Sequence, residues 1–256
     1  MVKIIGILNY NENSFSDGGK YSKYNDAIAR VSELFQQGAD IVDIGVCSTS
    51  YNAPIVTEYE ELKKIKPLLN KINCQNVSID SYNYNTIKYA INSGVKYIND
   101  VSGGKDYNVM ELIAGTPDIK YICMFSIVLP ANKKIRVSST NEIYDWMGFK
   151  IDECKKNGIS KERLILDPGI GFTTNASQSI KLLKEIKCLE DFGVEICISH
   201  SRKSFFKVIS NYQANDRDIE TLAASLYLSL FKVDYIRVHN VTMHKRALLV
   251  FNTLIG

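Results

Sequence analysis

Short apolar runs alternate with longer amphipathic segments along almost the whole chain. Runs rich in Ile, Val and Leu predict strands, and apolar residues at helical spacing predict helices. The expected strands are residues 3–8, 41–44, 77–79, 97–98, 120–124, 164–166, 195–198 and 235–238. The expected helices are residues 26–37, 58–72, 85–92, 108–114, 142–156, 177–189 and 242–254, with helical segments from 203 and over 218–230.

Eight strand–helix units within 256 residues, without a linker or a change in composition, favour an α/β fold of the (β/α)₈ TIM-barrel type. We expect one domain, residues 1–256. A doubly wound open sheet is the competing architecture. That sheet would form a ligand crevice at one switch point, whereas polar residues follow nearly every expected strand here. No Gly-rich dinucleotide fingerprint follows the first strand.

Composition narrows the functional class. The net charge is only +3 and charges of both signs are interspersed, which argues against a nucleic-acid or membrane-surface role. The six cysteines form no Cys-x-x-Cys pair, and several lie in apolar runs, as free thiols do in a reducing compartment. Met1 leads directly into a strand, and no apolar run reaches transmembrane length. We therefore expect a cytoplasmic enzyme.

Four expected strands end in Asp or Asn, namely Asn9, Asp80, Asn99 and Asp167. In a parallel α/β protein the carboxyl ends of the strands carry the chemistry. These side chains could hydrogen-bond a flat, nitrogen-rich ring. The alternative interpretation is that each one caps a helix or makes a turn, and for a single residue that alternative is the more common.

Cationic residues follow the last two expected strands. Ser201-Arg-Lys-Ser204 opens a helical segment, where backbone N–H groups and two cations could bind an anion. Arg237 and His239 lie on the same side of the last strand. Phosphate sites in such barrels often lie near strands seven and eight. We interpret His200 and His244 as surface or helix residues rather than ligands.

Seven segments in order along the chain resemble dihydropteroate synthase, a folate-pathway family. They are Gly6-Ile-Leu-Asn9 with Ser14-Phe-Ser-Asp-Gly-Gly19, Val42-Asp-Ile-Gly45 with Ser48-Thr49, Ser78-Ile-Asp80, Ile98-Asn-Asp-Val-Ser102, Leu166-Asp-Pro-Gly-Ile-Gly-Phe172, Ser201-Arg-Lys-Ser204 and Arg237-Val-His239. The resemblance implies condensation of 6-hydroxymethyl-7,8-dihydropterin diphosphate with 4-aminobenzoate. The products would be 7,8-dihydropteroate and pyrophosphate, and Mg²⁺ would bind the diphosphate.

The resemblance also implies a role for each matching residue. The pterin positions are Asp80, Asn99, Asp167 and Lys203. The diphosphate positions are Asn9, Arg237 and His239, with Asn9 beside the Mg²⁺. The aminobenzoate positions are Phe15, Thr49, Arg202 and Ser204. The expected catalytic set is Asn9, Asp80, Asp167, Lys203, Arg237 and His239. An SN1-like route is plausible because the pterin ring can delocalise the cation left by pyrophosphate, so no covalent nucleophile is needed.

Two loops depart from the family pattern. The family's Thr-Pro-Asp is replaced within residues 10–13, and within residues 46–52 its Glu, Arg and Pro are replaced by Cys47, Ser50 and Tyr51. Two alternatives follow. One is a catalytically altered pterin-binding paralogue. The other is a pterin methyltransferase of the methyltetrahydrofolate type, which has no reason to keep a diphosphate clamp. Family members commonly form homodimers and bind sulfonamides in the aminobenzoate subsite.

Overall fold

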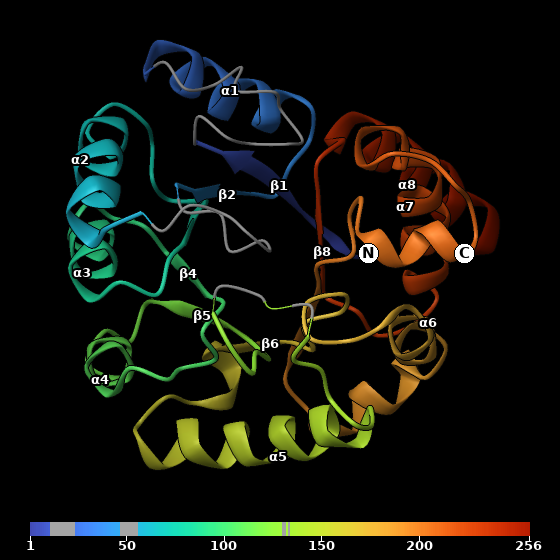
Figure 1. The fold of residues 1–256 in the computed structure, drawn as a ribbon. Helices are drawn as coiled ribbons and strands as arrows, with labels where there is room; N and C mark the ends of the chain where they lie inside the picture. Colours follow the sequence, from blue (N-terminus) through green and yellow to red (C-terminus); the bar gives the residue numbers. More distant parts are fainter. Residues whose placement is uncertain (11–23, 47–55, 130–131, 133) are drawn as a thin grey trace.

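Eight parallel strands close into a barrel with helices around it (Figure 1). The structure is a computed structural model that describes residues 1–10, 24–46, 56–129, 132 and 134–256. The strands are β1 (Lys3–Asn9), β2 (Ile41–Gly45), β3 (Val77–Asp80), β4 (Tyr97–Asp100), β5 (Lys120–Met124), β6 (Leu164–Asp167), β7 (Glu195–Ile198) and β8 (Tyr235–Val238). Each strand pairs with the next, and β8 pairs with β1. The expected barrel is therefore confirmed.

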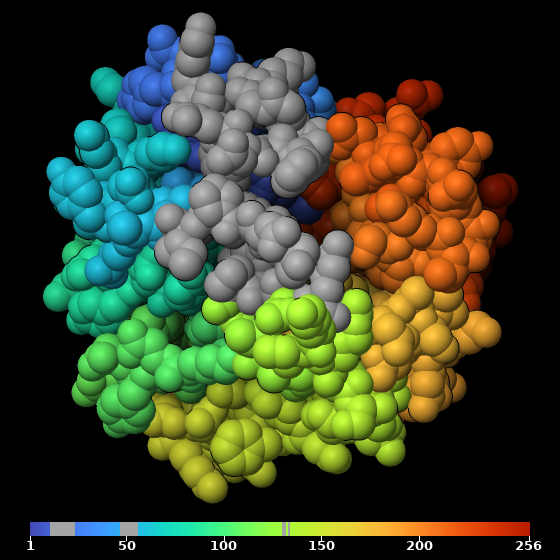
Figure 2. All heavy atoms as spheres, viewed as in Figure 1, coloured from blue at the N-terminus to red at the C-terminus, as the bar shows by residue number. Residues whose placement is uncertain are grey.

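Helices cover the outside of the barrel in chain order (Figure 1), and the sequence colours run around the molecular surface in the same order (Figure 2). The α-helices are α1 (Tyr24–Gln36), α2 (Glu58–Leu69), α3 (Tyr84–Asn92), α4 (Tyr107–Ala114), α5 (Asn141–Lys156), α6 (Ala176–Lys184), α7 (Asp218–Leu228) and α8 (Val241–Ile255). The 3₁₀ helices are Lys161–Arg163, Ile186–Phe192, Ser204–Val208 and Ala214–Asp216. The expected helix over 177–189 is thus two shorter ones, with Glu185 between them.

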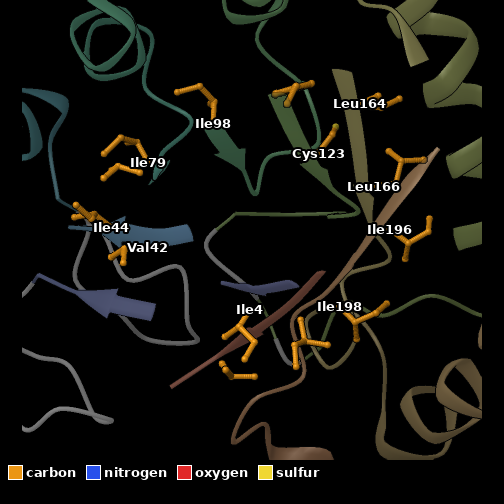
Figure 3. Close-up of a cluster of buried hydrophobic side chains, with 14 of the residues drawn as sticks. Ile4, Val42, Ile44, Ile79, Ile98, Cys123, Leu164, Leu166, Ile196 and Ile198 are labelled. Carbon is orange, nitrogen blue, oxygen red and sulfur yellow. The ribbon is translucent and has the colours of Figure 1, made fainter. Parts of the chain in front are cut away.

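Two apolar layers hold the barrel together. Side chains on the outward strand faces, such as Ile44, Ile79 and Ile98, join the apolar faces of the helices in the main core (Figure 3). The inward faces form a smaller cluster of Ile5, Ile41, Ile122, Ile165, Cys197 and Tyr235. Period-two alternation separates the two layers, as expected for strands in a packed barrel. This inner layer fills the barrel below the polar residues at its carboxyl end.

Candidate active site

Polar side chains continue the inward strand faces toward the carboxyl end of the barrel. An inward residue of the apolar layer is followed two or four positions later by another inward residue. The polar residues at these positions are Asn9, Asp43, Asn99, Asp167 and Arg237. On β3 the inward positions are both polar, Ser78 and Asp80. Strand register aligns several of them, because Asn9 pairs with Gly45, Gly45 with Asp80, and Asp80 with Asn99. Six strands therefore contribute polar groups to one mouth.

Arg237 lies at the centre of this mouth, between two carboxylates. Its Nε donates to Asp43 Oδ2 at 2.6 Å, and one Nη donates to Asp80 Oδ2 at 2.8 Å. Asn99 Nδ2 donates to the same Asp43 oxygen at 2.9 Å. Among the described residues the second amino group of Arg237, Nη1, has no hydrogen-bond partner. The guanidinium is therefore fixed on two sides and can still donate to an anion.

The charges of this cluster shift each other's ionisation. Burial raises the pKa of Asp80 to about 7, with Asp43 adding to the rise and Arg237 opposing it. The neighbouring carboxylates raise the pKa of Arg237, so it stays cationic although burial acts the other way. Asp43 is fully buried, and its Oδ1 has no hydrogen-bond partner among the described residues. The mouth thus keeps acceptor and donor atoms that protein groups do not use.

Asp167 ends β6 in a tight turn that fixes its carboxylate. The Gly169 N–H donates to Oδ1 at 2.8 Å, and Ser199 Oγ donates to Oδ2 at 2.5 Å. Gly169 has φ of 67°, and a Cβ there would lie 2.4 Å from the Phe125 carbonyl oxygen. Only glycine fits this position without displacing the backbone. The Asp-Pro-Gly sequence therefore sets the direction of a nearly fully buried carboxylate.

Lys203 reaches the same region from the segment after β7. Its Nζ donates to the carbonyl oxygen of Ile170. Its aliphatic stem lies against Gly171, where an added Cβ would approach Lys203 Cδ to 2.9 Å. Burial lowers the pKa of Lys203 to about 8, although the charge of Asp167 opposes this. Lys203 and Asp167 therefore belong to one electrostatic group.

His239 lies just beyond β8, two residues after Arg237. Its Nδ1 is 2.9 Å from Ser201 Oγ, and its backbone N–H donates to the same oxygen at 3.3 Å. Burial and the charges of Arg202 and Arg237 lower the pKa of His239 to about 3. The imidazole is therefore neutral at physiological pH and offers one N–H donor beside a permanent cation.

The expected helix N-terminus at Ser201–Ser204 is wrong in detail. Only a five-residue 3₁₀ helix begins there, and Arg202 has the left-handed φ of 58°. The Arg202 guanidinium is paired with Asp218 through two hydrogen bonds of 2.7 and 3.0 Å, and Ser204 is exposed. A short tight turn therefore takes the place of a helix start whose N–H groups would bind an anion.

The interpretation of His200 as a surface residue is also wrong. His200 and His244 are both fully buried. His200 Nε2 lies 2.8 Å from Ser225 Oγ and 3.2 Å from the Thr221 carbonyl oxygen. Because α7 covers this position, a polar residue after a strand is enclosed rather than solvated. Burial lowers the pKa of His200 to about 4.

The structure brings together most of the residues expected from the sequence. Asp80 and Asn99 are connected to Arg237, directly and through Asp43 respectively. Asp167 and Lys203 form a second group. Asn9 ends β1, which pairs with β8, and His239 directly follows β8. Arg202 is directed to Asp218 instead. Phe15 and Thr49, expected near the aminobenzoate, lie outside the described residues.

Three residues outside the expected set contact its members. Asp43 links Asn99 to Arg237, while Ser199 and Ser201 contact Asp167 and His239. The signal that could have found Asp43 is strand parity, because it lies two residues after inward-facing Ile41. The same parity applies to Ser199, two residues after Cys197. Side-chain direction was therefore more informative than residue type alone.

A metal would find few protein ligands in this mouth. Within the described ranges no three His, Cys, Asp or Glu side chains are grouped to hold a metal ion. Mg²⁺ does not require such a group. It commonly keeps several water ligands and takes its other ligands from one or two protein residues and from the phosphates of the substrate. The partly buried Asn9 ends β1 and carries an amide oxygen, a ligand type that suits this ion. The residues present therefore fit a substrate-borne Mg²⁺.

Comparison with known proteins agrees with this geometry. A family model described as "Pterin binding enzyme" matches residues 5–239. A dihydropteroate synthase of Clostridium beijerinckii is 32% identical, with 95% of this chain and 91% of that protein covered. The crystal structure of dihydropteroate synthase from Anaplasma phagocytophilum with bound 6-hydroxymethylpterin-monophosphate is 33% identical, with a TM-score of 0.90 and 99% of each chain covered. The Xanthomonas albilineans enzyme with 4-aminobenzoic acid is 26% identical, with a TM-score of 0.89 and 99% and 93% of the chains covered.

Proposed function

Because the chain belongs to the pterin-binding enzyme family and matches its dihydropteroate synthases over nearly their full length, we propose that it makes 7,8-dihydropteroate. The substrates would be 6-hydroxymethyl-7,8-dihydropterin diphosphate and 4-aminobenzoate, and pyrophosphate would leave. One observation carries this proposal. Asp80 and Asn99, acceptors suited to an aminopyrimidine edge, share a hydrogen-bonded cluster with Arg237, a cation suited to a diphosphate.

Two residues would bind the pterin ring, and two others would bind the diphosphate leaving group. Asp167 would accept from the amino-pyrimidine edge, and Lys203 would donate to the carbonyl or a ring nitrogen. Arg237 and His239 would hold the diphosphate, whose charge grows as the carbon–oxygen bond breaks. The protein then has to keep the ring cation and the arylamine aligned and exclude water, which are effects of position rather than of covalent chemistry.

We further propose that Asn9 contributes an oxygen ligand to Mg²⁺ on the diphosphate. When bound, the ion would neutralise charge on the leaving group. Support comes from the position of Asn9 at the end of β1, which pairs with the strand that carries Arg237. Removing Mg²⁺ with a chelator should abolish pyrophosphate release, and added Mg²⁺ should restore it. Substitution of Asn9 by Ala should raise the Mg²⁺ concentration needed for half-maximal rate.

The decisive assay is pyrophosphate release from the purified protein with Mg²⁺ and the pterin diphosphate, with and without 4-aminobenzoate. We expect release that depends on aminobenzoate, is inhibited by a sulfonamide and is lost in Lys203→Ala. Lys207→Ala is the matched control, because Lys207 lies four residues away and is exposed. Tight binding of the pterin diphosphate without release would refute the synthase and indicate a pterin-binding paralogue. Methyl transfer from a methylated folate would indicate the methyltransferase.

The aminobenzoate positions carried over from the family remain proposals for Arg202, Ser204, Phe15 and Thr49. Arg202 is the informative one, because its guanidinium is bonded to Asp218. If Arg202 binds aminobenzoate only through exchange of this ion pair, Asp218→Asn should lower the KM for aminobenzoate. If Arg202 has a purely structural part, Asp218→Asn should leave that KM unchanged and lower stability alone.

We propose that the protein forms a homodimer through α7 and α8, which pack against each other. These helices expose Ile219, Leu249, Val250 and Leu254, each with more than half of its surface accessible. On α8, Val250 and Leu254 are four residues apart and lie on one face, so these two exposed side chains are neighbours. Apolar patches of this kind mark interaction sites. Leu249→Glu together with Val250→Glu should convert a dimer into a monomer in sedimentation velocity, whereas a monomeric native protein would refute the proposal.

We also propose action in the cytoplasm. In support, Cys74, Cys123, Cys154 and Cys197 are buried free thiols, which a reducing compartment preserves. No helix within the described ranges is long and apolar enough to cross a membrane. Fractionation of the native host with an antibody to the protein would test this location, and recovery in an oxidising compartment would contradict it.

A further inference from the structure

Two serines after β7 contact functional residues from the two neighbouring strands. Ser199 and Ser201 flank His200, and both are at least nine-tenths buried. Ser199 bonds to Asp167 at the end of β6, whereas Ser201 bonds to His239 after β8. Because β7 pairs with β6 on one side and with β8 on the other, one short segment serves both. His200, between the serines, contacts α7 instead.

The contact between Ser199 and Asp167 fixes a carboxylate before any ligand arrives. Ser199 Oγ donates to Oδ2, and the Gly169 N–H donates to Oδ1. A carboxylate held at both oxygens cannot rotate about its terminal bond without losing a hydrogen bond. Each oxygen retains a lone pair, so the group can still accept from two adjacent N–H donors of a ring. Ser199 thus orients the acceptor edge proposed for the pterin.

The contact between Ser201 and His239 bears on the tautomer of the imidazole. Ser201 Oγ accepts the backbone N–H of His239 and has one proton of its own to donate. Among the described residues, Nδ1 of His239 is the only acceptor within reach of that proton. Donation to Nδ1 leaves the ring proton on Nε2. Since burial lowers the pKa of His239 to about 3, the neutral ring has a single N–H, and its position decides what the ring can bind.

We propose that Ser199 and Ser201 are positioning residues, Ser199 for the ring-binding Asp167 and Ser201 for His239, which it holds as the Nε2–H tautomer. This inference rests on the proposed function for the identity of the two ligands. Ser199 acts on pterin binding through Asp167, and Ser201 acts on diphosphate binding through His239. The ring of His239 donates a hydrogen bond to the leaving group as a neutral group, beside the permanent charge of Arg237.

Two partial ligands separate the two roles. 6-Hydroxymethylpterin carries the ring without the diphosphate, and inorganic pyrophosphate with Mg²⁺ carries the leaving group without the ring. In calorimetry, Ser199→Ala should weaken binding of 6-hydroxymethylpterin about tenfold and leave pyrophosphate unchanged, a loss typical of one hydrogen bond to a charged group. Ser201→Ala should show the opposite pattern. Ser199→Thr and Ser201→Thr keep the hydroxyl and should restore most of each loss.

Equal weakening of both ligands by either alanine variant would overturn the proposal, because a structural disturbance does not select one subsite. A threonine variant that unfolds at the same temperature as the native protein and yet fails to restore binding would also overturn the proposal. A native protein that binds neither ligand and releases no pyrophosphate would instead refute the proposed function.

The tautomer can be observed without any ligand. The chain has three histidines, so ¹⁵N–¹H correlation spectra of the imidazole nitrogens can be assigned with His200→Gln and His244→Gln. The native protein should show His239 protonated at Nε2 and bare at Nδ1. Ser201→Ala should give a mixture of tautomers at this ring, while Ser199→Ala should not. Protonation at Nδ1 in the native protein would overturn the assignment, whatever reaction the enzyme performs.

Discussion

The barrel mouth and the helical layer outside β7 and β8 both bury charged and polar side chains, but they leave different atoms unpaired. In the mouth, Arg237 bonds to Asp43 and Asp80, yet Arg237 Nη1 and Asp43 Oδ1 have no partners among the described residues. Of these two atoms Asp43 Oδ1 is fully buried, and a buried unpaired acceptor is costly unless a ligand or water pairs with it. The mouth therefore has the character of a binding site.

In the outer layer most polar groups bond to one another. Arg202 is paired with Asp218, which also accepts from Asn240 Nδ2 at 3.0 Å. Arg217 donates to the carbonyl oxygens of Tyr212 and Arg202. His244 Nε2, Glu220 Oε2 and Asn252 Nδ2 are exceptions among the described residues. This layer holds the turn after β7 in place, and thereby Lys203, but offers little to a ligand. The arginines of the outer layer are thus bonded to protein groups, whereas Arg237 in the mouth keeps one amino group without a protein acceptor among the described residues.

Removal of the shared cation should have the largest effect on the mouth. Arg237→Met leaves the carboxylates of Asp43 and Asp80 buried without a counter-charge, and both are less than one-eighth exposed. Loss of one partner from a buried ion pair costs about 3–5 kcal/mol. We expect a fall of about this size in the free energy of unfolding in urea, together with loss of pyrophosphate release.

A second substitution sharpens this test. Asp43→Asn in the Arg237→Met background removes one uncompensated charge, so it should recover part of the lost stability without recovering activity. If Arg237→Met unfolds at the same urea concentration as the native protein, the mouth does not depend on its cation and the contrast with the outer layer fails.

The alternation of strands and helices was predictable because each element has its own hydrophobic period. Strand bounds agree to within two residues for all eight strands; for example, residues 97–98 extend to Tyr97–Asp100. The helix expected over 177–189 was harder, because Leu182, Leu183, Ile186 and Leu189 keep an apolar spacing that does not reveal where an α-helix gives way to a 3₁₀ helix. The core pattern therefore specified the architecture better than the type of helix.

The site was predictable in its membership and not in its contacts. Asp80, Asn99, Asp167 and Arg237 follow strands, so their common position at the mouth could be deduced from the fold alone. Their partners could not, because Arg237 and Asp43 are 194 residues apart in the chain. His200 was misplaced for the same reason: its partners Thr221 and Ser225 lie on α7. Burial of a polar residue depends on such distant groups.

Lys203 links the two regions, and the pH dependence of catalysis should show its ionisation. Because burial lowers its pKa to about 8, the ammonium fraction falls from about nine-tenths at pH 7 to about one-tenth at pH 9. If the charged form binds the pterin, kcat/KM should decline roughly tenfold between these pH values. Lys203→Arg should be slower at pH 7 but lose this decline, since a guanidinium keeps its proton. Lys207→Arg is the control and should keep the native profile; a native profile that is flat to pH 9 would contradict the role.

The contribution of the outer layer to the free energy of unfolding should change at acidic pH rather than at neutral pH. Burial lowers the pKa of His200 to about 4, whereas an unfolded histidine has a pKa of about 6.5. Below pH 6.5 the unfolded chain binds a proton that the folded protein does not, so the free energy of unfolding should fall as the pH drops from about 6.5 to about 4.

His200→Gln can keep a hydrogen bond to Ser225 but cannot titrate. Its unfolding free energy should therefore lose about 1–2 kcal/mol less than that of the native protein between pH 7 and pH 5. Urea unfolding at the two pH values measures both slopes. Equal slopes would mean that His200 does not resist protonation in the folded protein, and would contradict the prediction.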